Sequence, residues 1–158
     1  MTHFVAPSVN IFIIKGSKVL LSRRANTGWM DGMLCPPGGH VEKGEAPVTA
    51  ALRELKEELG MSLRAEDLEF VCVAHRNTSP TEYVAYEFIV RDKNYDFKNA
   101  EPDLCSELVW VELHELPEDV IDDFRHIITR GVIGRKPFLE LGYPPQAVAP
   151  WLQADSAV

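Results

Sequence analysis

The most informative segment of the sequence is residues 39–61, which read GHVEKGEAPVTAALRELKEELGM. Pro47 suits the first turn of an α-helix, because its fixed φ is helical and its missing N–H needs no partner there. Gly60 suits the end of the same helix. The segment therefore predicts a helix over residues 47–59.

One face of this helix is apolar and the neighbouring face is acidic. The apolar residues recur at spacings of four, three and four: Val48, Leu52, Leu55 and Leu59. At about 100° per residue, Glu54, Glu57 and Glu58 share an arc roughly 100° wide. Three neighbouring carboxylates repel one another, so the helix itself gains nothing from grouping them.

A divalent cation would explain the grouped carboxylates. Mg²⁺ binds clustered oxygen ligands and leaves coordination positions for substrate phosphate. Arg53 lies four residues before Glu57, where its guanidinium can hold that carboxylate in place. The alternative is a solvated acidic face that includes Lys56, and the spacing alone leaves both interpretations open.

The segment also fits a longer signature, G-x5-E-x7-R-E-U-x-E-E-x-G-U, in which U is a bulky aliphatic residue. The matching residues are Gly39, Glu45, Arg53, Glu54, Leu55, Glu57, Glu58, Gly60 and Met61. This pattern resembles the Nudix box, and no specified position departs from it. The resemblance extends to the strand at 19–24, the turn at 37–39, and Trp110 with residues 115–117.

The resemblance implies an α/β fold: an α/β/α sandwich with a mixed central sheet, in which the box forms a loop–helix–loop catalytic motif. Residues 1–145 are expected to form one domain, and residues 146–158 a C-terminal tail. The β-prone runs predict strands over 9–15, 18–24, 69–76, 82–90 and 107–113. A second helix is expected over 118–130, ending before Gly131. The Cys-Pro-Pro-Gly-Gly run at 35–39 is expected to be neither regular helix nor central strand.

The resemblance also implies an activity, metal-dependent hydrolysis of the P–O–P bond of a nucleoside diphosphate linked to another group. A pyrophosphate is a polyanion that repels hydroxide, so catalysis must neutralise charge and orient water. A chain of net charge −8 can supply that positive charge through bound cations. The expected ion is Mg²⁺, with Mn²⁺ as the alternative.

Site residues follow from the resemblance, position by position. The expected metal ligands are Glu54, Glu57, Glu58 and the backbone carbonyl of Gly38. The expected catalytic residues are Glu54, Glu57, Arg53 and Glu45, of which Arg53 orients a glutamate and Glu45 supports the cluster. The general base is left open between Glu54, the first choice, and three others: Glu57, Glu82 and Glu101.

Substrate contacts are expected in and around the loop after residue 24. Arg24, or alternatively Arg23, is the expected phosphate contact, since strand alternation sends the two to opposite faces. Trp29 either stacks on a base or anchors the loop on the core. Gly39 is expected to approach the substrate.

Residues 99–105, NAEPDLC, resemble a stretch of MutT-like nucleoside triphosphate pyrophosphohydrolases. This favours a nucleoside triphosphate that is cleaved to a monophosphate and pyrophosphate. One alternative is a nucleotide sugar, ADP-ribose or a dinucleoside polyphosphate. Another is a non-catalytic, nucleotide-binding regulatory domain, although a pure binder has little need for such a carboxylate cluster.

Composition limits the partners and the compartment. Sixteen basic against 24 acidic residues argue against nucleic acid and anionic membranes, which need clustered positive charge. Apolar runs fall far short of the roughly 20 residues that span a bilayer. Three cysteines without CxxC pairing indicate reduced thiols in a cytoplasmic protein. The expected partner is a small-molecule nucleotide, and a homodimer is left open.

Overall fold

The apolar run near the N-terminus forms the central strand of the molecule. In the computed structural model, which describes residues 4–78 and 80–143, β1 (Ala6–Lys15) pairs antiparallel with β2 (Lys18–Arg24). Gly16 joins them with a φ of +60°, a conformation that glycine adopts without strain. The predicted hairpin is confirmed.

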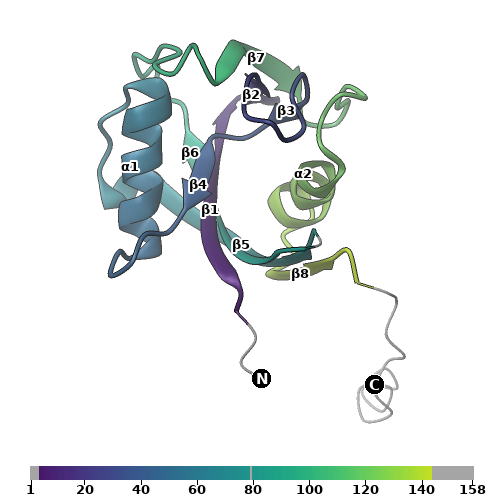
Figure 1. Ribbon diagram of the computed structural model, residues 1–158. Coiled ribbons are helices and arrows are strands. Elements are labelled where there is room, and N and C mark those ends of the chain that lie inside the picture. Colours follow the sequence, from purple (N-terminus) through teal and green to yellow (C-terminus); the bar gives the residue numbers. More distant parts are fainter. Residues whose placement is uncertain (1–3, 79, 144–158) are drawn as a thin grey trace, which may run out of the picture.

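The hairpin belongs to an eight-stranded mixed sheet (Figure 1). Along its main path the strands are β3 (Leu34–Cys35), β2, β1, β6 (Glu82–Arg91), β5 (Leu68–Asn77) and β8 (Phe138–Leu141). Two further strands join it: β4 (Gly38–His40) pairs with β1, and β7 (Cys105–Glu112) pairs with β2. β6 runs parallel to β1, and β8 runs parallel to β5.

Two strands share one edge of β1. β2 pairs with it only at residues 13–15, whereas β4 pairs with it at residues 8–10. Beyond the hairpin, β2 diverges from β1 and pairs with β3 at Ser22 and Arg23, whereas its other edge pairs with β7 along its whole length. The sheet therefore opens between β4 and the far end of β2, and a cavity lies there.

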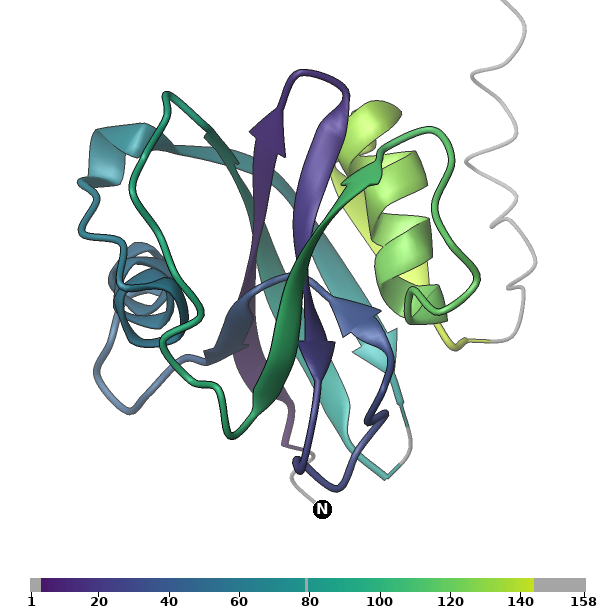
Figure 2. The same cartoon turned by 90° about the horizontal axis from the view of Figure 1, so that it is seen from above.

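Helices cover both faces of the sheet, as Figure 2 shows edge-on. Alternate residues of β1 point to opposite faces, and both sets are apolar. Val9, Ile11 and Ile13 pack with α1 (Pro47–Leu59), whereas Phe12 and Ile14 pack with α2 (Asp122–His126) and the π-helix η2 (Ile127–Ile133). The predicted α/β/α sandwich with a mixed sheet is confirmed.

The second helical segment differs from the expected helix over 118–130. It begins at Asp122 and continues through Gly131 to Ile133, so Gly131 does not end it. A Cβ on Gly131 would lie 2.7 Å from the Sγ of Cys72 on β5. The glycine therefore allows the helix to approach the sheet, and its interpretation as a stop signal was wrong.

Two further features depart from the expectations. The short strands β3 and β4 lie on either side of Pro36 and Pro37, and both extend into the predicted irregular run at 35–39. The edge strand β8 had no predicted counterpart. The expected tail at 146–158 lies outside the described residues, and the expected domain span of 1–145 stays a prediction. Within the part of the chain that the structure describes, no helix has the length and apolar content to cross a membrane.

Candidate active site

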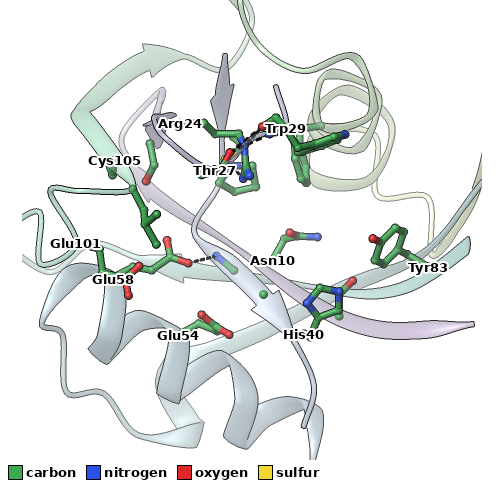
Figure 3. A pocket seen from close by; sticks show the side chains of 18 of the residues that line it. Asn10, Arg24, Thr27, Trp29, His40, Glu54, Glu58, Tyr83, Glu101 and Cys105 are labelled. Carbon is green, nitrogen blue, oxygen red and sulfur yellow. Dashed lines mark hydrogen bonds between the residues drawn. The ribbon is translucent and has the colours of Figure 1, made fainter. Parts of the chain in front are cut away.

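A cavity of about 500 Å³ occupies the opening in the sheet (Figure 3). This volume is sufficient for a small organic ligand. The charged side chains that line it are Glu54, Glu58 and Glu101 together with Arg24 and Arg76. Gly38 and Gly39 of β4 contribute backbone to the wall beside the glutamates.

α1 places two of its glutamates in this cavity. The helix has Pro47 in its first turn and ends at Gly60, whose φ of +67° is left-handed, as the sequence predicts. Glu54 and Glu58 are four residues apart and therefore share one side of the helix. The side chain of Glu57 is 52% exposed and does not line the cavity.

Glu58 is held in place by the backbone of β4. The N–H of Gly38 donates to its Oε1 at 3.0 Å. Burial raises the pKa of Glu58 to about 8, and the negative charges of Glu54 and Glu101 act in the same direction. Burial also raises the pKa of Glu54, against the opposing effect of Arg53. The ionised forms of Glu54 and Glu58 are therefore unfavourable in this site unless a cation binds beside them.

The two glycines of β4 make room for this arrangement. A Cβ on Gly39 would overlap the carboxylate of Glu54, and one on Gly38 would collide with the carbonyl of Val9 on β1. The turn can approach both α1 and β1 only because these positions lack side chains.

Arg53 is the centre of a hydrogen-bond network beside the cavity. Its Nε and Nη2 donate to the two carboxylate oxygens of Glu45, at 2.9 and 3.0 Å. Its Nη1 donates to Oε1 of Glu54 at 2.7 Å and to Oε2 of Glu57 at 3.1 Å, and its Nη2 also donates to the carbonyl of His40. These hydrogen bonds lower the pKa of Glu45. Arg53 does not line the cavity, so the contacts suit the expected orienting role.

The loop before β7 brings Glu101 to the same site. The N–H groups of Lys98 and Ala100 donate to the carbonyls of Leu59 and Glu58 at the end of α1. Asn99 closes the loop, because its Nδ2 donates a hydrogen bond to the carbonyl of Cys105, with a donor–acceptor distance of 2.6 Å. This internal bond gives a physical reason for the asparagine of the NAEPDLC segment.

Of the expected general bases, the structure brings Glu54 and Glu101 into the cavity and leaves two outside. Glu57 is on the exposed side of α1, and Glu82 lies 3.2 Å from Nε2 of His75. Glu82 does not line the cavity. Figure 3 shows Glu54, Glu58 and Glu101 gathered on the side of α1.

Of the two arginines at the end of β2, only Arg24 reaches the cavity. Arg23 instead forms ion pairs with Glu107 and Asp119 outside it. The Nε of Arg24 donates 2.8 Å to the carbonyl of Trp29, and its guanidinium lies 4.8 Å from the centroid of the indole. Trp29 is 45% exposed and lines the cavity, so it is not a core anchor of the loop.

The donor set fits a hard divalent cation. Glu54, Glu58 and Glu101 offer carboxylate oxygens, the ligand type that Mg²⁺ and Mn²⁺ prefer. Across residues 4–78 and 80–143, no three Asp, Glu, His or Cys side chains are already gathered as a ligand set. Mutual repulsion is expected to keep such carboxylates apart until a cation lies between them.

Sequence reasoning missed the side of the cavity formed by the middle of the sheet. Asn10 interrupts the apolar pattern of β1, but this alone does not show which residues it faces. Its Nδ2 donates 3.1 Å to Oε1 of Glu87, a fully buried carboxyl on β6. Burial raises the pKa of Glu87 to about 7, against the opposing charge of Arg76. Arg76 and Tyr83 complete this side.

The match of residues 5–130 to the NUDIX domain model shows that the chain belongs to the NUDIX family. The crystal structure of a MutT NUDIX hydrolase from Burkholderia pseudomallei shares its fold, with a TM-score of 0.72 and 24% identity over 80% of this chain and 98% of that one. The predicted Nudix, MutT-like resemblance is confirmed.

Three curated relatives carry named activities. The ADP-ribose pyrophosphatase of Methanocaldococcus jannaschii is 30% identical over 117 residues, which are 74% of this chain and 68% of that protein. The 8-oxo-dGTP diphosphatase of Escherichia coli is 38% identical over 55 residues, which are 35% of this chain and 43% of that protein. An m7GpppN-mRNA hydrolase of Xenopus laevis is 50% identical over 48 residues, so the chain spans only 16% of the length of that relative.

Proposed function

We propose that this chain hydrolyses the P–O–P bond of a nucleoside diphosphate linked to another group, with a nucleoside triphosphate as the preferred substrate. The products would be a nucleoside monophosphate and pyrophosphate. The observation that carries the proposal is the meeting of Glu54, Glu58 and Glu101 in one cavity that also contains Arg24. Carboxylates that bind cations and an arginine that binds phosphate are the two groups that a metal–polyphosphate substrate requires.

The proposed metal is Mg²⁺, or alternatively Mn²⁺, held by Glu54, Glu58 and the carbonyl of Gly38. Glu101 lines the cavity and Glu57 does not, so we favour Glu101 over Glu57 as the further carboxylate ligand. When bound, the ion neutralises charge on the anhydride and makes bound water more acidic.

Glu54 is the proposed general base. Arg53 engages its Oε1, which fixes the carboxylate and leaves Oε2 available. Burial raises its pKa, which makes the carboxylate a stronger base. Arg53 and Glu45 act through Glu54 and are positioning residues. Arg24 is the proposed phosphate contact.

The second candidate is hydrolysis of ADP-ribose, a nucleotide sugar or a dinucleoside polyphosphate by the same residues. The relative from Methanocaldococcus jannaschii, an ADP-ribose pyrophosphatase, favours this candidate. A non-catalytic regulatory domain is disfavoured, because partly buried carboxylates are a costly way to build a simple nucleotide-binding site. The cytoplasmic location, the homodimer and the absence of nucleic-acid and membrane partners stay predictions.

A substrate screen tests the proposal. Wild-type protein with Mg²⁺ is incubated with nucleoside triphosphates, oxidised deoxynucleoside triphosphates, ADP-ribose, nucleotide sugars and dinucleoside polyphosphates, and the products are separated by chromatography. We expect a monophosphate and pyrophosphate from triphosphates, with the highest kcat/KM in that class. Faster cleavage of ADP-ribose would select the second candidate, and no cleavage of any compound would overturn the proposal.

A further inference from the structure

Arg76 is a buried cation in the wall of the cavity, and the reaction proposed above does not use it. It stands on β5 with 7% of its surface exposed. Its guanidinium carbon lies 5.4 Å from the ring centroid of Tyr83 on β6 and 5.2 Å from that of Phe124 on α2. Cation–π contacts with two rings fix the plane of the guanidinium.

The hydrogen-bond donors of Arg76 are largely unused. Within residues 4–78 and 80–143, its side chain makes no hydrogen bond, and its Nε is both buried and unpaired. The nearest carboxylate is that of Asp123, 3.9 Å from Nη1, which is beyond hydrogen-bond distance. A guanidinium carries only donors and stays protonated in proteins. Unpaired donors in a buried site are costly, so an acceptor on a ligand would be bound favourably.

The position of Arg76 determines which part of a substrate it can meet. In Figure 3, Glu54 and Glu58 lie on the side of α1, whereas Tyr83, the stacking partner of Arg76, lies on the opposite side. Asn10 and His40 lie between them in this view. A nucleotide with its phosphates at the glutamates would extend its other end towards Arg76.

A neutral acceptor suits this position better than a second anion. Asp123 already offsets the charge of Arg76, and the buried carboxyl of Glu87 is near enough to interact electrostatically with it. Arg76 therefore recognises a ligand through the direction of its N–H groups rather than through net positive charge. A carbonyl oxygen on a planar ring meets that requirement, whereas an amino group would place N–H against N–H.

We propose that Arg76 is a specificity-determining residue that donates to a carbonyl oxygen of the nucleobase. The cavity therefore prefers oxo-substituted bases to amino-substituted bases of the same size. This inference rests on the proposed function, since it assumes that the phosphates occupy the glutamate side. An arginine that pairs with a base carbonyl contributes roughly 10- to 100-fold discrimination.

Two substrate pairs isolate the carbonyl. Inosine and adenosine triphosphates differ in the 6-oxo or 6-amino group and the linked ring nitrogen, and uridine and cytidine triphosphates differ likewise at position 4. In wild-type protein we expect kcat/KM to favour the oxo member of each pair by about 10-fold or more, chiefly through KM. In Arg76→Met the ratio should fall to near one, because the oxo substrates lose activity and the amino substrates do not. Arg76→Lys should retain part of the preference.

The controls separate specificity from folding. Arg91→Met removes an exposed arginine on β6 that pairs with Glu69, and it should leave both ratios unchanged. Equal kcat/KM for the two members of each pair in wild-type protein would overturn the inference. So would an unchanged preference in Arg76→Met with a lower Tm, which would make Arg76 a structural clamp between β5 and α2. If Arg76→Met fails to fold, the wild-type and Arg76→Lys ratios decide.

Failure of the proposed function would give a different result. If wild-type protein cleaves none of the screened compounds, the hydrolase proposal fails, and equilibrium binding of inosine against adenosine triphosphate still tests Arg76. Tighter binding of the inosine nucleotide, lost in Arg76→Met, would support the inference in that case. Equal binding of the two would contradict it.

Discussion

Arg53 and Glu45 form a two-pronged ion pair, with Nε to Oε1 at 2.9 Å and Nη2 to Oε2 at 3.0 Å. The same guanidinium holds Glu54 through Nη1, so the pair fixes the arginine that orients the proposed base. Only a guanidinium can make both parallel hydrogen bonds and the third contact at once. This ion pair therefore explains why the Nudix box includes Arg53 and Glu45, although neither residue lines the cavity.

Arg53→Lys should lower kcat by roughly 10- to 100-fold with little change in KM, because Glu54 loses its fixed orientation but the substrate contacts remain. Steady-state kinetics with the preferred triphosphate measure this. Arg64→Lys, at an exposed arginine paired with Glu66, is the matched control and should behave as wild type. A kcat for Arg53→Lys within twofold of wild type would remove the orienting role.

Gly131→Ala should destabilise the fold by about 1–3 kcal/mol, because the new Cβ meets the Sγ of Cys72 inside the core. Chemical denaturation measures the free energy of unfolding. The double variant Gly131→Ala/Cys72→Ala should lose less stability than the two single changes added together, since Cys72→Ala removes the sulfur. Strict additivity would show that the glycine is needed for another reason.

Glu87 should make stability depend on pH. Its pKa of about 7 in the folded protein exceeds its ordinary value of 4.5. The folded state therefore binds this proton more tightly, and the free energy of unfolding falls as pH rises from about 4.5 to about 7. Above that window the loss is complete.

Glu87→Gln removes this titration and keeps an oxygen that can accept from Asn10. At about 1.4 kcal/mol per pH unit, the variant should gain up to roughly 3 kcal/mol over wild type between pH 4.5 and pH 7. Urea denaturation across this range measures the difference, with Glu66→Gln at an exposed carboxyl as control. A difference that stays constant with pH would contradict the assigned pKa.

Trp29→Ala tests whether the indole beside Arg24 contacts the base. If it does, KM for nucleoside triphosphates should rise about 10-fold, since stacking on one base contributes roughly 1–3 kcal/mol. KM for inorganic tripolyphosphate, which has no base, should change much less. An equal rise for both compounds would mean that Trp29 acts only by supporting Arg24.

Local sequence rules predicted the hairpin and α1, because turn residues and proline and glycine positions act within a few residues. They failed at Gly131, where the need for glycine comes from Cys72 on a distant strand. Helix periodicity grouped Glu54, Glu57 and Glu58, but periodicity cannot show which of them faces a cavity. The structure leaves Glu57 exposed and brings in Glu101 through a loop bonded to the end of α1.

The far side of the cavity could not be read from the sequence for the same reason. Arg76 belongs to a strand whose pattern resembles that of any partly buried strand. The proposed role of Arg76 depends on the rings of Tyr83 and Phe124, which come from β6 and α2 and pack against it only in the folded chain.

The central claim is that the carboxylates of this cavity support metal-dependent cleavage of a phosphoanhydride. The most direct test is the rate of pyrophosphate release from the preferred nucleoside triphosphate, with saturating Mg²⁺, by wild type, Glu58→Gln and the exposed control Glu66→Gln. We predict that Glu58→Gln lowers kcat by about 10³-fold, since a lost metal ligand removes several kcal/mol of transition-state stabilisation. Glu66→Gln should match wild type, and all three proteins should melt cooperatively. Wild-type turnover by a folded Glu58→Gln protein would contradict the claim.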